Sequence, residues 1–219
     1  MPQSLMKLQD VSVGAQALQG FLRLPADPSG LVIFAHGAGS SHLSVRNNYV
    51  AEELGKRGLA TLLFDLLTEQ EARDRANVFD IPLLSTRMIE AIDWVCENPD
   101  IPPLPIGLFG SSTGAAAAMV AAAHAPEKVQ AVVSRGGRAD MAAQALPKVA
   151  APVLLIVGGH DQQVLELNRD AASRLTCPMQ LKIIPGATHL FEEPGALEQV
   201  VELAGAWFET HLASEGTAP

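Results

Sequence analysis

Apolar runs rich in Val, Ile and Leu alternate with segments of helical spacing from about residue 30 onward. Continuous apolar runs of this length are typical of strands that a parallel sheet buries on both faces. The predicted strands are LVIFAHG (31–37), LATLLFD (59–65), PIGLFGS (105–111), VQAVVSRGG (129–137), PVLLIVGGHD (152–161) and MQLKIIPGATH (179–189). Apolar spacing, proline boundaries and alanine content predict helices at about 44–58, 80–98, 113–125, 164–175 and 197–212. This alternation predicts an α/β fold with an open, mostly parallel sheet and helices on both faces.

The two ends of the chain follow a different pattern. Residues 1–30 alternate more loosely and include a Pro-Ser-Gly turn, which predicts one or two antiparallel edge strands. The last residues, 213–219, are expected to be frayed. A length of 219 residues fits a single domain, 1–219.

Composition narrows the function classes. A chain that is 48% hydrophobic and 18% charged is expected to be well cored, and its net charge of −9 argues against nucleic acid as a partner. Neither an apolar membrane span nor a signal peptide is predicted, which favours a cytoplasmic location. Cys96 and Cys177 are interpreted as free core thiols in preference to a disulfide. No Cys/His spacing indicates a metal site.

Gly110-Ser111-Ser112-Thr113-Gly114 matches the pattern G-x-S-x-G. Where a strand precedes it and a helix follows, this pattern forms a tight turn that projects the hydroxyl of its central residue. Ser112 is therefore the candidate nucleophile, because Ser111 lacks the flanking glycines. The pattern alone leaves a second interpretation open, in which the small residues only let a helix pack closely on the sheet.

A serine nucleophile needs a base, and the base needs an orienting carboxylate. Asp161 and His189 end two later strands, so the order along the chain is Ser112, Asp161, His189. Carboxyl ends of parallel strands meet at one edge of a sheet, so the three side chains are expected to converge. Less favoured candidates are the acids Asp65 and Glu166 and the histidines His36, His42, His124, His160 and His211.

An oxyanion site requires two N–H donors. Thr113 N–H follows the nucleophile directly, and the second donor is assigned to Ala38 N–H, with Gly37 as its rival, in the loop His36–Ser41. A glycine-rich loop after a strand can also bind phosphate, but the chain lacks both G-x-x-x-x-G-K-[ST] and G-x-G-x-x-G.

These segments together resemble the α/β-hydrolase superfamily. HGAGSS, LLFDLLTEQE, GLFGSSTGAAAA, VVSRGGR, LLIVGGHD and PGATHLFEE are similar to its small dienelactone-hydrolase-like branch, which includes domains fused to phosphoribosyltransferases, and the resemblance covers about residues 20–212. It implies the α/β-hydrolase fold. Dienelactone hydrolases proper carry a cysteine nucleophile, whereas Ser112 stands here, so the resemblance implies a serine esterase. No phosphoribosyltransferase partner domain is expected within these 219 residues.

We therefore expect hydrolysis of a small-molecule carboxylic ester through an acyl-enzyme, with no cofactor or metal. Thioesterase or acyltransferase action on the same triad, and a non-catalytic ligand-binding role, remain alternatives. The oligomeric state is left open.

The substrate pocket is expected to be open, because residues 136–150 provide one short helix and no lid domain. The segment Leu66–Asp80, which carries Arg73, Arg75 and Phe79, is a candidate pocket wall. Arg135 and Arg138 follow a strand end and either bind a substrate carboxylate or, as favoured here, pair with Asp140 or Asp161. The predicted pocket residues are His36, Gly37, Asp65, Leu66, Arg135 and Leu190.

Overall fold

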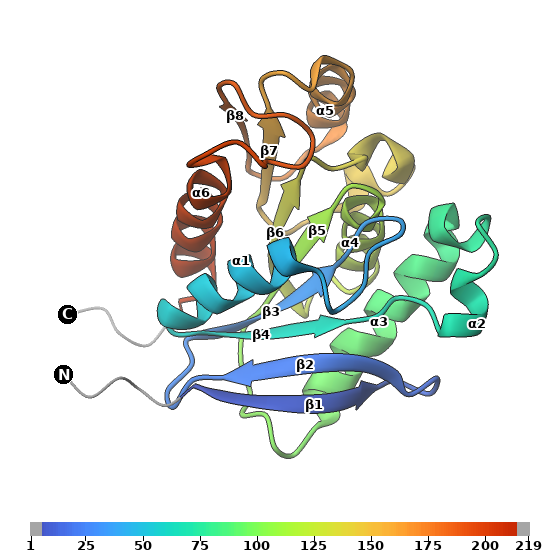
Figure 1. Cartoon of the computed structure of the whole chain (residues 1–219), viewed down its shortest axis with the longest axis vertical. Coiled ribbons are helices and arrows are strands. Elements are labelled where there is room, and N and C mark those ends of the chain that lie inside the picture. Colours follow the sequence, from blue (N-terminus) through green and yellow to red (C-terminus); the bar gives the residue numbers. More distant parts are fainter. Residues whose placement is uncertain (1–5, 214–219) are drawn as a thin grey trace.

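The computed structural model describes residues 6–213, and within them an eight-stranded sheet forms the centre of the molecule (Figure 1). The strand order is β1-β2-β4-β3-β5-β6-β7-β8; β1 and β2 pair antiparallel, β2 pairs antiparallel with β4, and the remaining pairs are parallel. The strands are β1 Lys7–Val13, β2 Leu18–Leu24, β3 Gly30–Ala35, β4 Leu59–Phe64, β5 Ile106–Ser111, β6 Val129–Arg135, β7 Val153–Gly158 and β8 Met179–Ile184. This arrangement confirms the predicted mostly parallel α/β sheet.

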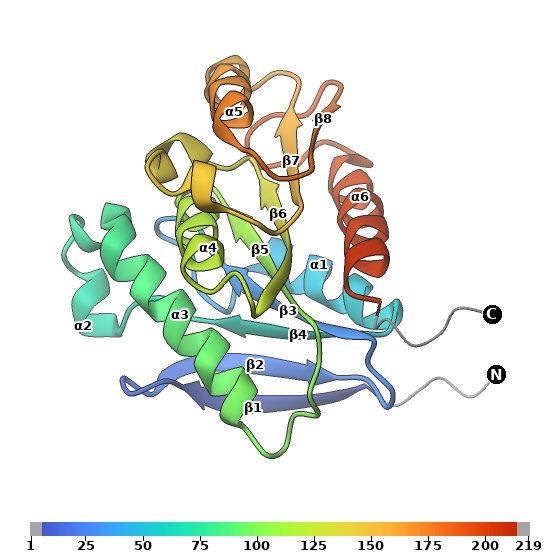
Figure 2. The ribbon, with the colours of Figure 1, turned by 180° about the vertical axis from the view of Figure 1, so that it is seen from behind.

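Helices cover both faces of the sheet. Helices α1 and α6 lie on the face seen in front in Figure 1, and α3 and α4 lie on the face seen in front in Figure 2, where α5 covers β7 and β8. The helices are α1 Val45–Lys56, α2 Glu69–Ala72, α3 Ile81–Glu97, α4 Thr113–His124, α5 Gln162–Arg174 and α6 Ala196–His211.

Alternation along the central strands divides the core into two layers. Leu31 and Ile33 of β3 pack toward α3 and α4, whereas Val32 and Phe34 pack toward α1 and α6. Six of the seven alanines of α4 are fully buried, so this helix lies closer to the sheet than larger side chains would allow. The resulting close contact positions the turn that precedes α4.

Several predicted boundaries differ from the observed ones. The strand predicted at 179–189 ends at Ile184 and the one predicted at 129–137 ends at Arg135, because the residues that follow form loops at the carboxyl edge. Segment 136–150 holds two 3-10 turns, Ala139–Ala142 and Leu146–Lys148, where one short helix was predicted. Segment 66–80 contains α2 and a 3-10 turn, Asn77–Phe79.

The N-terminal edge of the sheet agrees with the prediction from sequence, whereas the environment of the two cysteines does not. Strands β1 and β2 occupy the predicted N-terminal edge, while residues 1–5 and 214–219, including nearly all of the predicted frayed tail, lie outside the described residues. Both cysteines are free, but Cys96 is exposed and Cys177 is only partly buried, so their interpretation as core thiols was wrong. Between residues 6 and 213, no helix combines the length and apolar character needed to cross a membrane.

Candidate active site

Ser112 occupies the turn between β5 and α4 with a backbone conformation that is rare for a side-chain-bearing residue. Its φ is 50° and its ψ is −122°, in a region that glycine tolerates far better. The turn is held from the neighbouring strand: Ser112 N–H donates to Arg135 O (3.3 Å), and Ser112 O accepts from Arg138 N–H (2.9 Å). The strained backbone directs the serine side chain away from the strand direction, and the residue is partly exposed.

The two glycines of the motif have no room for a side chain. A methyl group on Gly114 would stand 2.2 Å from Ala35 O, and one on Gly110 would stand 2.4 Å from Ala115 Cα. Both obstacles are backbone atoms, which cannot rotate away. The close packing of α4 and the sharp turn are therefore one feature, and the two interpretations of G-x-S-x-G describe the same geometry.

Asp161 and His189 form a short pair, with 2.6 Å between His189 Nδ1 and Asp161 Oδ2. Asp161 is the N-cap residue of α5 but its carboxylate makes no capping bond, so it remains available to the imidazole. A carboxylate that accepts from Nδ1–H in the neutral ring leaves Nε2 as the basic nitrogen. This is the tautomer that a general base requires.

The loop that carries His189 is fixed by backbone contacts with β7 and β6. His160 N–H donates to Ala187 O (2.9 Å), and a methyl group on Gly158 would stand only 2.4 Å from the same oxygen. On the other side, a methyl group on Gly136 would stand 3.1 Å from His189 O. Glycines at the ends of two adjacent strands thus let the histidine loop lie directly on the sheet edge.

Ser112 and His189 line a common cavity of about 550 Å³. Arg135 and Leu190, two of the predicted pocket residues, line it as well. Among the described residues, Ser112 Oγ and His189 make no hydrogen bond to each other in this resting state, and such bonds are often long without substrate. The structure therefore brings the nucleophile candidate and the Asp161–His189 pair to one cavity.

The loop after β3 borders this cavity. A methyl group on Gly37 would stand 3.0 Å from Ser112 Cβ, a tight contact, so glycine at this position lets the loop lie close to the serine. Ala38 N–H, the predicted second oxyanion donor, donates to Thr113 Oγ1 at 3.0 Å. Thr113 N–H is the first of α4 and has no acceptor within the helix. In the resting state one of the two predicted donors is thus already engaged.

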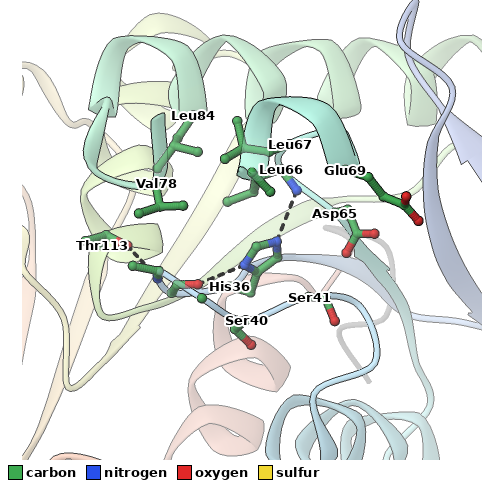
Figure 3. Close-up of a pocket in the computed structure, with 14 residues that line it drawn as sticks. His36, Ser40, Ser41, Asp65, Leu66, Leu67, Glu69, Val78, Leu84 and Thr113 are labelled. Atoms are coloured by element: carbon green, nitrogen blue, oxygen red, sulfur yellow. Dashed lines mark hydrogen bonds between the residues drawn. The ribbon is translucent and has the colours of Figure 1, made fainter. Parts of the chain in front are cut away.

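His36 holds the same loop in place (Figure 3). Its Nδ1 lies 3.0 Å from Gly37 O, and its Nε2 accepts from Leu66 N–H at 3.1 Å. Burial lowers the pKa of His36, which favours the neutral ring that can donate at one nitrogen and accept at the other. Both nitrogens are occupied, so His36 fixes the loop and is not available as a base.

Residues 37–41 line both the cavity of Ser112 and a second cavity of about 260 Å³. Figure 3 shows the lining of the second cavity. His36, Asp65 and Leu66, which we predicted in one pocket with Arg135 and Leu190, line this second cavity, and Gly37 borders both. The predicted single pocket is therefore divided by the loop. The wall from segment 66–80 is built by other residues than expected: Leu66, Leu67, Glu69, Ala72 and Val78 contribute, while Arg73, Arg75 and Phe79 line neither cavity.

Two other charged side chains, Asp65 and Arg138, each have a partner close by. Asp65 accepts from His42 N–H (2.7 Å), and its second oxygen lies 2.9 Å from His42 Nδ1. Arg138 pairs with Asp140 through two bonds of 2.9 Å, as favoured from sequence, but Arg135 does not pair with either predicted acid. Throughout residues 6–213, no three His, Cys, Asp or Glu side chains gather as metal ligands.

The eight-stranded sheet, its helices on both faces and the strand–turn–helix at Ser112 are those of the α/β-hydrolase fold. More narrowly, the chain belongs to the dienelactone hydrolase family, whose sequence model matches residues 18–209.

Individual relatives are similar to most of this chain. A dienelactone hydrolase from Anabaena variabilis is 54% identical, with a TM-score of 0.91 over 96% of this chain and 99% of that one. Est1E from Butyrivibrio proteoclasticus is 18% identical with a TM-score of 0.78, over 94% of this chain and 99% of that one, and so shares the fold. Two Mycobacterium tuberculosis proteins, provisionally named phosphoribosyl transferases, are 57% identical over 206 residues, which is 94% of this chain and 46% of theirs. The chain thus spans about half the length of these curated relatives.

Proposed function

We propose that this protein is a serine hydrolase that cleaves carboxylic esters with small or accessible acyl groups through an acyl-enzyme. The observation that carries the proposal is the 2.6 Å contact between His189 Nδ1 and Asp161 Oδ2 at the cavity that Ser112 also lines. A serine at a strained turn next to an oriented imidazole is the arrangement that acyl transfer requires.

In the proposed reaction, Ser112 Oγ attacks the ester carbonyl carbon while His189 Nε2 takes the hydroxyl proton. Asp161 stabilises the imidazolium, and the tetrahedral oxyanion accepts hydrogen bonds from Thr113 N–H and Ala38 N–H. The imidazolium then protonates the alkoxide as the C–O bond breaks and the alcohol leaves. Water, deprotonated by the same nitrogen, attacks the acyl-enzyme and releases the carboxylic acid and free Ser112.

For Ala38 this mechanism implies an exchange of acceptors. Its N–H now donates to the Thr113 hydroxyl at 3.0 Å, a neutral acceptor. A hydrogen bond to an ionised acceptor is about twice as strong as one between neutral groups, so a developing oxyanion competes successfully for this donor. The Thr113 hydroxyl keeps the loop close to α4 until the oxyanion forms.

The rim of the cavity suits an organic acyl or alcohol group. Leu43, Val45 and Leu190 line it and are exposed by 62%, 84% and 42%. Exposed apolar side chains grouped around a cavity are typical of ligand sites. The Anabaena relative is named a dienelactone hydrolase, so a dienelactone belongs among the test substrates. The name of the mycobacterial proteins concerns chains about twice as long and carries no argument for phosphoribosyl transfer at this site.

The test combines covalent labelling with turnover. A fluorophosphonate probe is expected to label the wild-type protein, and mass spectrometry is expected to find the label on Ser112 rather than on adjacent Ser111. Ser112→Ala and His189→Ala are expected to lose about 10³-fold or more in kcat/KM on 4-nitrophenyl butyrate. Ser173→Ala, at an exposed position on α5, serves as the matched control and should keep both labelling and turnover.

Three results would contradict the proposal. They are near wild-type turnover in Ser112→Ala, a label on Ser111, or an unlabelled protein that still binds butyrate, which would indicate a ligand-binding role. Comparing phenyl butyrate with S-phenyl thiobutyrate, and each with and without an added alcohol acceptor, separates an esterase from a thioesterase or an acyltransferase.

A further inference from the structure

Helix α1 carries an asparagine on the face that packs against the sheet. The buried positions of this helix include 47, 50, 51 and 54, which is the spacing of an apolar stripe, and the last three hold Val50, Ala51 and Leu54. Asn47 is 3% exposed, so an amide stands where the helical period calls for an apolar side chain. Burial of an amide destabilises a fold unless its polar atoms are hydrogen-bonded.

The side-chain amide of Asn47 is only weakly hydrogen-bonded. Its Oδ1 accepts from Ser111 Oγ at 3.4 Å, which is longer than an ordinary O–H···O bond. Among residues 6–213 its Nδ2 has no acceptor, and this atom is not enclosed by the core. Asn47 and Ser111 both line the cavity of Ser112, so the free N–H groups of the amide face this cavity.

Two other asparagines show how this fold satisfies a side-chain amide elsewhere. Nδ2 of the neighbouring Asn48 donates to two backbone oxygens at 2.7 and 2.9 Å, and its Oδ1 accepts from Arg23. Nδ2 of the buried Asn168 donates to two backbone oxygens at 2.8 Å, and its unpartnered Oδ1 is enclosed by the core. Neither of these residues lines the cavity of the nucleophile. Asn47 differs from both because its free donor faces that cavity.

We propose that Asn47 is a specificity-determining residue that binds a hydroxyl group of the substrate together with Ser111, and that the preferred ester is hydroxylated. Ser111 Oγ donates its hydrogen to Asn47 Oδ1, so its lone pairs remain free to accept. The pair thus offers one donor, Asn47 Nδ2–H, and one acceptor, Ser111 Oγ. A hydroxyl group matches both, whereas a carbonyl or ether oxygen uses only the donor. This inference rests on the proposed esterase function for its substrate, but hydroxyl binding is measurable without turnover.

The turnover test uses two pairs of uncharged esters in which a hydroxyl group replaces a methyl group. Methyl 3-hydroxybutyrate and methyl 3-methylbutyrate vary the acyl side, and 2-hydroxyethyl butyrate and propyl butyrate vary the alcohol side. The wild type is expected to prefer the hydroxy ester in at least one pair, by kcat/KM from acid release at constant pH. In that pair the ratio of kcat/KM, hydroxy over methyl, is expected to fall about 3- to 10-fold in Asn47→Leu. No preference in the wild type, or an unchanged ratio in the variant, would overturn the proposal.

Stability separates this role from a structural one. Leucine has as many side-chain heavy atoms as asparagine and continues the apolar stripe, so Asn47→Leu is expected to keep or raise the melting temperature. The matched control, Asn168→Leu, loses two hydrogen bonds to backbone oxygens and should lower the melting temperature but leave the ratio unchanged. A large fall in melting temperature in Asn47→Leu, with equal losses on all four esters, counts against the proposal. If Asn47→Leu does not fold, Asn47→Ala provides the same comparison.

Binding is measured on the inactive Ser112→Ala variant by ligand-observed NMR titration with the same four esters. The hydroxy ester of the preferred pair is expected to bind more tightly than its methyl analogue, and adding Asn47→Leu should abolish the difference. If this difference is found but the wild type hydrolyses none of the esters, the proposed esterase function fails and the hydroxyl site stands. Hydrolysis of all four esters without any difference in binding would overturn the hydroxyl site alone.

Discussion

The backbone of Ser112 predicts an unusual order of stability among variants. At φ 50° and ψ −122° a residue with a Cβ is strained by about 1–3 kcal/mol, and only glycine relieves that strain. Glycine also gains freedom in the unfolded chain, which lowers the free energy of unfolding by about 0.5–1 kcal/mol relative to alanine. Ser112→Gly should therefore be more stable than Ser112→Ala by about 0.5–2 kcal/mol, although neither variant has a nucleophile.

Urea denaturation at pH 7, followed by fluorescence or circular dichroism, measures this difference as a shift in midpoint at constant slope. The matched control is Thr86, an exposed position within α3, where Gly is expected to be less stable than Ala by about 1 kcal/mol. The sign of the Gly–Ala difference should thus reverse between the two positions. Equal stability of the two Ser112 variants, or greater stability of Ser112→Ala, would refute the claim that the turn is strained.

Two further predictions concern the same edge of the sheet. Gly114→Ala places a methyl group 2.2 Å from Ala35 O and should lower the free energy of unfolding by about 1–3 kcal/mol in urea denaturation, although alanine ordinarily favours a helix. The control is Gly205→Ala in α6, whose methyl group meets the Arg57 side chain at 2.7 Å and should change the free energy of unfolding by less than about 1 kcal/mol. Similar losses of stability in Gly114→Ala and Gly205→Ala would contradict this account. Burial lowers the pKa of His36, so the folded protein favours the neutral ring. This contribution to the free energy of unfolding is fully present above about pH 6.5 and is lost as the pH falls through the lower folded-state pKa. The free energy of unfolding is expected to fall by up to about 1.4 kcal/mol per pH unit in that range. His36→Gln should remove this part of the pH dependence between pH 7.5 and 5.5, and an identical slope in the variant would show that another group is responsible.

Much of the fold was predictable because strands that are buried on both faces consist mainly of apolar residues, which can be recognised in the sequence. The strands within the runs LVIFAHG and PVLLIVGGHD are buried at every position, because both faces of a central parallel strand are covered. Errors concentrated where strands end. We predicted a strand up to His189, but β8 ends at Ile184. The residues that follow form a loop that lies against the ends of β7 and β6 and positions His189 there.

Pairings within a few residues were also predictable, whereas partners supplied by tertiary structure were not. Arg138 reaches Asp140 two positions away, and that contact follows from local geometry. Whether Arg135 has a partner depends on elements far along the chain. The hydroxyl of Thr113 was missed for the same reason, because its partner, Ala38, lies 75 positions away and no local pattern marks it.

The strained Ser112 follows the end of β5, and the unpaired Arg135 ends the adjacent strand β6; a backbone hydrogen bond from Ser112 N–H to Arg135 O joins them. Each lowers the stability of the resting protein, and neither improves the packing of the apolar layers beneath. The packing of α4 offsets the cost of the strained turn, because Gly114 and the buried alanines of this helix bring it close enough to the sheet to hold Ser112 in this conformation.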